Sequence, residues 1–411
     1  MEIYDIIVYL LYFIGIFVSV FYFITYFENR NKLRSKLADK FPLISVLIPA
    51  YNEEDVISQT IQSVLNQDYP KDKLEIIVVD DGSTDKTYEV AKSFSNIKAY
   101  KKENNGKASA LNYGISKAKG QLISVLDADT FLTPDFLKKT VKYFEDEDVG
   151  IIVSTLKPYK PRKLIERIQV IEYVISSFIR KILSLNNSLS AAPAGSIFRA
   201  ELFKKHGGFD EHNLTEDFEI ALKAQSHNYK LVHAVDAVAY TDVPSTFKSL
   251  ARQRIRWSYG ALYNIKKYRK LMSTSYGDFG MFFFPLIIVS IISSIAVLGI
   301  MVFRILESLL GKIGLLSATN FNISYVLSQA SIIPNVTNLK IILGVFTFII
   351  ALTLLFLARK YTSEAKSAER LNNTNISFIS YLVYVFIYSF VLITFWIISL
   401  GYFLVGKTPK W

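Results

Sequence analysis

Four long apolar runs stand out along the chain, and none of them contains a charged residue. They lie at 6–27, 280–303, 341–358 and 376–405. About 20 apolar residues are needed to cross a bilayer as a helix, so each run is a candidate span, the third being close to the lower limit. We therefore expect an N-terminal membrane anchor over residues 1–28 and a C-terminal membrane region over residues 280–411 that contains the other three spans.

Between the first two runs, short buried-strand patterns alternate with helical patterns. The expected strands cover 43–49, 74–80, 96–100, 121–127 and 149–156, and the expected helices cover 53–67, 83–94, 106–120 and 134–146. Alternation of this kind predicts an α/β fold with a mostly parallel sheet and flanking helices. Residues 29–279 are thus expected to form one domain outside the membrane.

Two further segments have apolar and basic residues at helical spacing, which predicts amphipathic helices at 161–183 and 245–268. We expect both to lie at the membrane surface. A helix that simply faces the protein core is the alternative for the first. The second contains Gln253, Arg256 and Trp257, which share one helical face and are candidates for binding a substrate.

The distribution of charged residues indicates how the chain is oriented in the membrane. The chain has 47 Lys and Arg against 36 Asp and Glu, a net charge of +11. We attribute this charge to an anionic membrane surface and an anionic substrate, and expect no nucleic acid partner. The basic flanks near 30–40 and 359–370 predict that residues 28–279 are cytoplasmic, in a multi-pass protein of the cell membrane with both ends outside. The absence of cysteine excludes disulfides and thiolate chemistry.

Acidic and amide side chains follow three of the expected strands, in the stretches PAYNEE, DDGSTD and LDADT. Ligands bind outside the carboxyl ends of parallel strands, so these stretches should border one crevice. Asp127 and Asp129 form a D-x-D that suits Mg²⁺ or Mn²⁺ together with substrate phosphates. The triplet alone is weak, because Asp146 and Asp148 repeat it in an acidic turn, and a surface loop is the alternative. No G-x-G-x-x-G follows the first strand, which argues against a dinucleotide dehydrogenase.

The other acids each have two interpretations. Asp80 and Asp81 are suited to contact a nucleotide base or ribose, or else belong to a turn that caps the next helix. Glu216 and Asp217 begin a helical pattern, where acids are favoured by the helix dipole. The alternative for this pair is catalysis, since a carboxylate beside a leaving group can act as a general base for an attacking hydroxyl.

Taken together, these stretches resemble the membrane-embedded family 2 glycosyltransferases that make hyaluronan, chitin oligosaccharides, cellulose and poly-N-acetylglucosamine. The resemblance covers about residues 43–260 and rests on motifs in the order that the family has. They are PAYNE (49–53), VVDDGSTD (78–85), NNGKASALN (104–112), LDAD (126–129), PAGSIFR (193–199), GGFD (207–210), TED (215–217) and QRIRW (253–257).

The resemblance implies a GT-A-like fold and a UDP-sugar donor. It implies that Asp129, with Asp127 alongside, holds Mg²⁺ or Mn²⁺ against the diphosphate. The residues it assigns to the nucleotide are Ala50, Tyr51, Glu53, Asp80, Asp81 and Lys107. Asp217, next to Glu216, becomes the catalytic base, and Arg256 and Arg254 face the diphosphate. Trp257 offers a platform for the acceptor sugar, with Gln253 hydrogen-bonding nearby.

The activity implied is inverting transfer of a sugar, expected to be N-acetylglucosamine, to a growing polysaccharide or oligosaccharide at the cytoplasmic membrane face. Only four spans and no gating loop are expected. Four helices are few for a polysaccharide channel in one chain, which leaves room for a pore formed by a homodimer. Transfer of a single sugar to a membrane lipid, as ceramide glucosyltransferases do, is one alternative. A non-catalytic membrane scaffold is another.

Overall fold

The computed structural model describes residues 3–29, 40–319, 323, 338–363 and 376–409. One eight-stranded sheet forms its framework, in the order β3-β2-β1-β4-β7-β6-β8-β5. The strands are β1 (Ile44–Ala50), β2 (Leu74–Asp80), β3 (Lys98–Lys101), β4 (Leu122–Val125), β5 (Thr130–Leu132), β6 (Val149–Pro158), β7 (Ser196–Arg199) and β8 (Lys230–Thr241).

The first half of the sheet is parallel, as predicted, and the second half is mixed. Strand β1 pairs in parallel with β2 on one side and with β4 on the other, and β2 pairs in parallel with β3. Strand β7 then runs antiparallel to both β4 and β6, and β5 runs antiparallel to β8. The α/β fold is confirmed. The sequence pattern had not indicated β5, β7 or β8.

Helices cover both faces of this sheet. Successive side chains of a strand point to opposite faces, and here apolar side chains point to both, so both faces must be covered. In β1, Val46 and Ile48 enter one buried cluster, and Leu47 enters the other. Helices α2 (Ile57–Leu65) and α5 (Phe136–Val141) contribute to the first cluster. Helices α4 (Lys107–Lys117), α7 (Ala200–His206) and α8 (Glu216–Ser226) contribute to the second. The short helix α3 (Thr87–Lys92) lies beside β2 and β3.

Four helical segments are long and apolar enough to cross a membrane: Tyr4–Asn29, Phe279–Ala318, Leu339–Tyr361 and Phe378–Leu404. They correspond to α1 (Ile3–Asn29), η6 with α10 (Phe279–Phe283, Phe284–Ala318), α12 (Leu339–Ser363) and the series α13, η8, α14 (Phe378–Val383, Tyr384–Tyr388, Ser389–Leu404). The second continues well beyond the expected end at 303. Much of the basic sequence used to predict orientation, at 30–39 and 364–370, lies outside the described residues.

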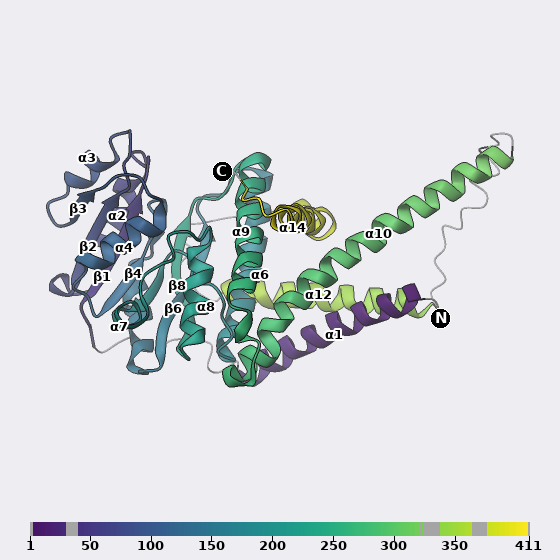
Figure 1. Cartoon of the computed structure of the whole chain (residues 1–411), viewed down its shortest axis with the longest axis horizontal. Helices are drawn as coiled ribbons and strands as arrows, with labels where there is room; N and C mark the ends of the chain where they lie inside the picture. Colours follow the sequence, from purple (N-terminus) through teal and green to yellow (C-terminus); the bar gives the residue numbers. More distant parts are fainter. Residues whose placement is uncertain (1–2, 30–39, 320–322, 324–337, 364–375, 410–411) are drawn as a thin grey trace.

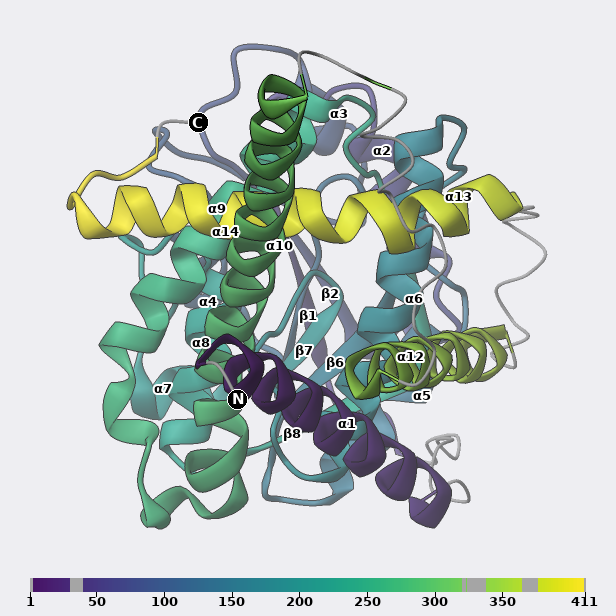
Figure 2. The ribbon, with the colours of Figure 1, turned by 90° about the vertical axis from the view of Figure 1, so that its right-hand side faces the viewer.

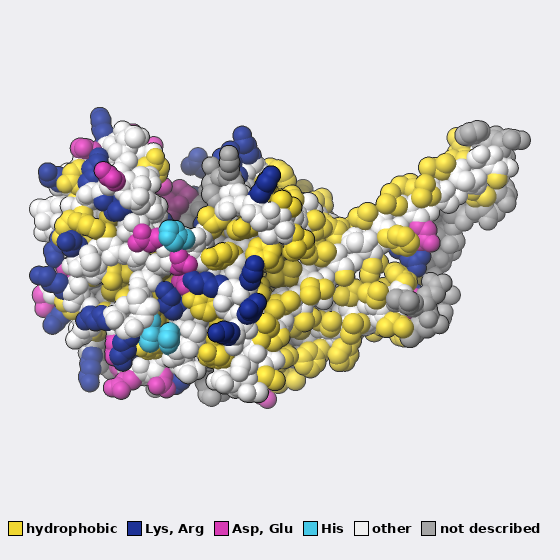
Figure 3. All heavy atoms as spheres, in the orientation of Figure 1, with side chains coloured by type: hydrophobic (Ala, Val, Ile, Leu, Met, Phe, Trp, Pro, Cys, Tyr) yellow, Lys and Arg dark blue, Asp and Glu magenta, His cyan; other side chains and the backbone are white. Residues whose placement is uncertain are grey.

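Helices α6 (Leu164–Leu185) and α9 (Phe247–Lys267) lie between the sheet and the apolar helices (Figure 1). Apolar side chains gather on the helices that project from this end, whereas charged side chains cover the α/β domain (Figure 3). Helix α14 packs against α9 and crosses it, and the Ser399 hydroxyl donates to the Ile255 carbonyl over 3.2 Å. The α13–α14 segment runs across the direction of α1 and α12: it is seen end-on in Figure 1 and lengthwise in Figure 2.

The central strand provides a test of this core. Ile48 is fully buried, whereas Ile292 on α10 is 61% exposed on an apolar helix. Replacing buried Ile48 by Ala should lower the free energy of unfolding by about 2–5 kcal/mol, because a cavity remains where the side chain was. Thermal unfolding of the detergent-purified protein should show a clearly lower midpoint for Ile48→Ala and little change for Ile292→Ala. Equal effects would contradict the assignment of the core.

Candidate active site

The carboxyl ends of β1, β2 and β4 meet at one edge of the sheet because these strands are parallel neighbours. A cavity of about 220 Å³ opens there. Its walls bring together most residues that the sequence assigned to the nucleotide and the metal. They are Ala50, Tyr51, Glu53, Asp81, Lys107, Asp127 and Asp129, with Pro49 and Ala128 between them.

Asp80 and Asp81 have separate roles. Asp80 is fully buried and accepts a hydrogen bond from the Ser83 backbone over 3.3 Å, as the turn interpretation predicts. Asp81 accepts from the Gly106 backbone over 2.7 Å and from Lys102 Nζ over 2.7 Å. Its carboxylate therefore fixes the loop that begins α4 and also faces the cavity. Asp80 is not among the residues that line it.

Negative charge accumulates beside this cavity. Burial, followed by the charges of Asp129 and Asp127, raises the pKa of Glu53 to about 7. Burial and the neighbouring Asp127 raise the pKa of Asp129 to about 6. Asp242, at the end of β8, adds to both shifts. Carboxylates that repel one another in this way favour binding of a proton or a cation between them.

Lys107 joins the two acidic motifs. Its Nζ lies 2.7 Å from an Asp127 oxygen and 2.9 Å from a Glu216 oxygen. Burial alone would lower the pKa of Lys107, but the two carboxylates raise it above its ordinary value. Helix α4 carries Lys107 in its first turn, so the helix fixes the distance between the D-x-D loop and the start of α8. The sequence placed Lys107 near the nucleotide but did not indicate this bridge.

Asp217 lies in the first turn of α8, where its carboxylate accepts from the Phe218 backbone over 2.8 Å. Burial and the adjacent Glu216 raise the pKa of Asp217, whereas Lys107 and Arg256 oppose that shift. A carboxylate with a raised pKa that faces a cavity is suited to accept a proton. The helix-start interpretation of this acidic pair is confirmed, since α8 begins at Glu216, and catalysis stays a prediction for two side chains that line a second, larger cavity.

Helix α9 approaches the start of α8 very closely. A Cβ atom on Gly260 would lie 2.2 Å from the Thr215 hydroxyl oxygen, so no larger residue fits there without movement. Asn264, fully buried one turn later, exchanges side-chain hydrogen bonds with Asn213 and donates to the Thr215 hydroxyl over 3.0 Å. The Arg256 guanidinium donates to the Leu214 carbonyl over 3.0 Å. These contacts hold Arg256 within the electrostatic reach of Asp217.

Arg254 is already paired. Its guanidinium donates to a Glu172 oxygen over 2.7 Å and to the Gln253 side chain over 2.7 Å, and it lies over the Trp257 ring at 4.2 Å. The same Glu172 oxygen accepts from the Tyr388 hydroxyl over 2.8 Å. Arg254 thus ties α9 to α6, and its charge is largely compensated there. Of these two arginines, Arg256 is the one whose charge is less compensated, because it donates to a backbone carbonyl, whereas Arg254 is paired with a carboxylate.

A larger cavity, of about 550 Å³, contains the catalytic candidates. It is lined by Lys107 and by members of the D-x-D, TED and QRIRW motifs: Asp127, Asp129, Glu216, Asp217, Gln253, Arg254, Arg256 and Trp257. The structure therefore brings together these side chains, which are up to 150 positions apart in the sequence. Tyr51 and Glu53 line only the smaller cavity, which shares Lys107, Asp127 and Asp129 with the larger one.

Several residues on its walls had not been indicated by the sequence. Thr241 and Asp242 enter from β8, where the Thr241 hydroxyl lies 3.5 Å from an Asp129 oxygen. Leu392 and Trp396 enter from α14. A strand pattern at 230–241 would have indicated the first pair. No local signal indicates the second, since their position depends on how a distant helix packs.

The donor atoms fit a hard divalent cation that is shared with a substrate. Among the described residues, no group of three or more His, Asp and Glu side chains could hold a metal by itself. Mg²⁺ is commonly bound through one or two carboxylates plus substrate phosphates. Asp127 and Asp129 supply two carboxylates, and the raised pKa of Asp129 reflects negative charge that a cation would offset.

Comparison with known proteins agrees with this geometry. The model of the family described as "Glycosyl transferase family 2" matches residues 45–207. A probable glycosyltransferase of Bacillus subtilis, YdaM, is 34% identical over 245 residues, which cover 56% of this chain and 57% of that protein. A poly-β-1,6-N-acetyl-D-glucosamine synthase of Staphylococcus epidermidis is 31% identical over 224 residues, or 53% and 54%. The chain thus matches little more than half the length of these curated relatives.

Among solved structures, the mannosyltransferase PcManGT of Pyrobaculum calidifontis, in complex with GDP-Man and Mn²⁺, matches 97% of this chain and all of its own. The TM-score is 0.54 and the identity 18%, a likeness of fold. The family match covers β1 through β7 and the D-x-D loop. Residues 45–207 of this chain therefore form a glycosyltransferase family 2 domain.

Proposed function

We propose that this protein transfers N-acetylglucosamine from UDP-N-acetylglucosamine to an acceptor hydroxyl of a glycan at the cytoplasmic face of the membrane, with inversion at the anomeric carbon. The observation that carries the proposal is the single cavity lined by Asp129, Asp217, Arg256 and Trp257. A donor phosphate site, a base and an acceptor platform are all needed for this reaction, and the cavity offers one candidate for each. The relatives that make poly-N-acetylglucosamine support the choice of sugar.

In this proposal, the nucleotide lies in the smaller cavity, between Tyr51, Glu53 and Asp81. The diphosphate then reaches the residues shared with the larger cavity. Arg256 extends its guanidinium toward the phosphates, since its planar donors match phosphate geometry. When bound, a divalent cation at Asp129 and Asp127 would offset charge on the leaving diphosphate. Arg254 acts as a positioning residue because Glu172 already holds its guanidinium.

The transfer itself needs one proton acceptor. Asp217 takes the proton of the acceptor hydroxyl, and the oxygen forms a bond to the anomeric carbon. The bond from that carbon to the diphosphate oxygen breaks, and UDP leaves with the electron pair. Attack on the face opposite to UDP inverts the configuration. Lys107 lies between Asp127 and Glu216, so it holds the base at a fixed distance from the donor.

A second candidate is transfer of one sugar to a membrane lipid. It is favoured by the position of Leu392 and Trp396, which give the cavity an apolar wall from a membrane-type helix. A non-catalytic scaffold is the remaining alternative. It offers no reason for Asp129, Asp217 and Arg256 to line one cavity.

Replacing the proposed base tests the central claim. Asp217→Asn should reduce transfer from labelled UDP-N-acetylglucosamine by about 10²–10⁴-fold, the usual contribution of a general base. Binding of UDP should change little, because the substitution keeps the shape of the side chain. Rates would be measured on the detergent-purified full chain with Mg²⁺ or Mn²⁺.

The matched control is Asp148→Asn, which alters an exposed acid of the second D-x-D, paired with Lys230 at 2.8 Å. This variant should keep the activity of the natural protein. If Asp217→Asn were as active as Asp148→Asn, another group would have to be the base. If the natural protein turned over no nucleotide sugar, the scaffold alternative would be favoured.

The pH dependence gives a second test. Asp217 must be deprotonated to act, and burial with Glu216 raises its pKa. The rate should therefore fall as the pH decreases through a value above the ordinary 3.8 of an aspartate. Glu216→Gln removes a charge that raises this pKa, so the acidic limb of the kcat profile should move to lower pH. A shift to higher pH would contradict the electrostatic assignment.

A further inference from the structure

We propose that the acceptor is a membrane lipid with an anionic phosphate headgroup, which enters the active-site cavity from the bilayer along α6, with its phosphate at Arg180. This inference rests on the sugar transfer proposed above, and of the two candidate acceptors it selects the lipid in place of the glycan. It is carried by three adjoining cavities, by an arginine that has no hydrogen-bond or ion-pair partner among the described residues, and by the direction of the last apolar helix.

A second cavity, of about 310 Å³, adjoins the active-site cavity along α6. The two share Glu172, Ser176, Arg180 and Ala191 as lining residues. A third cavity, of about 370 Å³, lies farther into the apolar helices and shares Ile175, Ile179 and Tyr384 with the second. The three cavities therefore form a series from the active-site cavity to the apolar helices, in which each cavity shares wall residues with the next.

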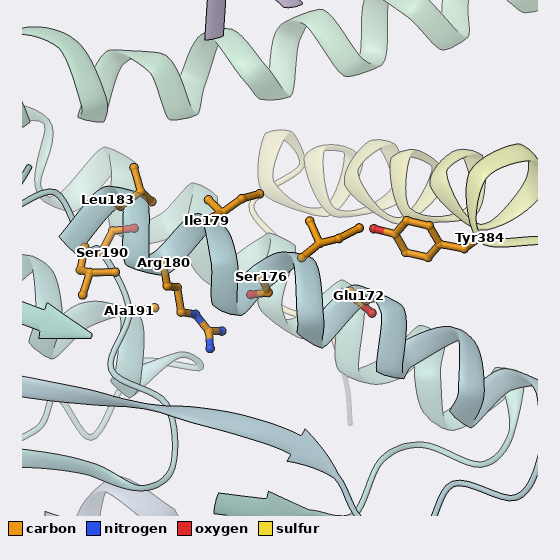
Figure 4. A pocket seen from close by; sticks show the side chains of 10 residues that line it. Glu172, Ser176, Ile179, Arg180, Leu183, Ser190, Ala191 and Tyr384 are labelled. Atoms are coloured by element: carbon orange, nitrogen blue, oxygen red, sulfur yellow. The ribbon is translucent and has the colours of Figure 1, made fainter. Parts of the chain in front are cut away.

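Helix α6 presents a different face to each end of this series. Glu172, Ser176 and Arg180 recur every four residues, so they form one stripe that faces the active site. Ile175 and Ile179 form the neighbouring stripe, which faces the apolar helices. In Figure 4, Arg180 extends from α6 toward the sheet, away from the side on which Ile179 and Tyr384 lie. A molecule lying across α6 would thus meet a polar end and an apolar end.

Arg180 is the strongest indication of an anion. Within the described part of the chain, no hydrogen bond or ion pair joins its guanidinium to another residue. Glu172, the nearest acid on the same stripe, already accepts from Arg254 and from Tyr388. Burial lowers the pKa of the Arg180 guanidinium, and Tyr173, Asp217 and Glu172 offset this only in part. A partly buried guanidinium of this kind is stabilised by a phosphate that pairs with it.

The third cavity suits a hydrocarbon chain. It lies among α1, α6, α12 and η8, and its walls are almost entirely apolar, with side chains such as Phe178, Phe348 and Leu352. The polar exceptions are Tyr22, Tyr384 and Ser389. A glycan, which is covered with hydroxyl groups, would leave those groups without partners in such a site. The chemistry of the cavity therefore favours a lipid tail over a growing sugar chain.

The direction of α13–α14 provides the third argument. Spanning helices tilt by up to about 40° from the bilayer normal, and α13–α14 runs across α1 and α12 (Figure 2). With α1 and α12 crossing the bilayer, α13–α14 lies along its surface, although its length and composition would also allow a span. Trp396 of this helix then lies at headgroup depth, where tryptophan is favoured, and forms a wall of the active site.

The turn that contains Tyr384 is also unusual. Residues Tyr384–Tyr388 form a π-helical turn in an otherwise α-helical segment, and such turns occur frequently at functional sites. The turn places Tyr384 in the second and third cavities and lets Tyr388 reach Glu172. The π-helical turn, packed against α6, thus lies at the boundary between the polar and the apolar end of the series of cavities.

The test measures lipid binding and sugar transfer separately on the full chain. Native mass spectrometry in detergent would compare dioctanoyl phosphatidylglycerol, dioctanoylglycerol and glycerol 1-phosphate. The natural protein should retain phosphatidylglycerol at about tenfold lower concentration than dioctanoylglycerol, because a hydrogen bond to a charged group is lost without the phosphate. Glycerol 1-phosphate, which lacks the chains, should bind more weakly than either.

Variants separate the two ends of the site. Arg180→Gln should abolish the preference for phosphatidylglycerol and leave UDP binding unchanged, whereas Arg162→Gln, at an exposed arginine just before α6, should keep the preference. Ala351→Trp fills the third cavity and should weaken binding of both lipids about tenfold. Val345→Trp, on the exposed face of the same helix, should not.

Transfer is then measured from labelled UDP-N-acetylglucosamine in vesicles that contain phosphatidylglycerol. Label that extracts into organic solvent, and is lost in Arg180→Gln, would support the proposal. Label found only in a large water-soluble product, with no preference among the lipids, would overturn it and leave the proposed function intact. Lipid binding without turnover of any nucleotide sugar would overturn both, since a lipid that receives no sugar is not an acceptor.

Discussion

The candidate site depends on one ammonium group placed between two acidic motifs. Lys107 Nζ contacts Asp127 and Glu216 at once, although these acids belong to a loop after β4 and to the start of α8. Without that cation, the carboxylates of both motifs would repel one another in a partly buried cavity. The two acidic motifs can therefore lie close together only if a positive charge stands between them. Helix α4 supplies that charge, because Lys107 is in its first turn.

The site also depends on a contact between the α/β domain and the apolar helices. Glu172 on α6 accepts from Arg254 on α9 and from Tyr388 on η8, so one carboxylate joins three helices. The site therefore cannot be separated into a soluble half and a membrane half. Removing Glu172 would leave a buried guanidinium uncompensated, a change that is strongly destabilising in general. Contacts of this kind transmit the position of the apolar helices to the catalytic motifs.

Much of this arrangement could be predicted from the sequence because it follows from local rules. Parallel strands bring their carboxyl ends together, so PAYNEE, DDGSTD and LDADT had to border one crevice. The pairing of Arg254 with Glu172 could not be predicted, because it depends on the packing of two helices that are far apart in the sequence. Strand β8 was missed for a local reason: His233 and Asp236 interrupt its apolar pattern, although most of the strand is buried. Asp242, which follows β8, was missed with it.

The position of α14 has a consequence for how the protein is made. During synthesis, N-terminal domains generally fold before later segments have emerged. The sheet and the D-x-D loop are complete long before Leu392 and Trp396 leave the ribosome, so the active-site cavity lacks one wall until then. A newly made chain can therefore hold the sheet and the D-x-D loop in folded form while the larger cavity of the candidate site stays open to water. The cavity closes only once the last apolar helix has packed against α9, which restricts the finished site to chains whose synthesis has passed α14.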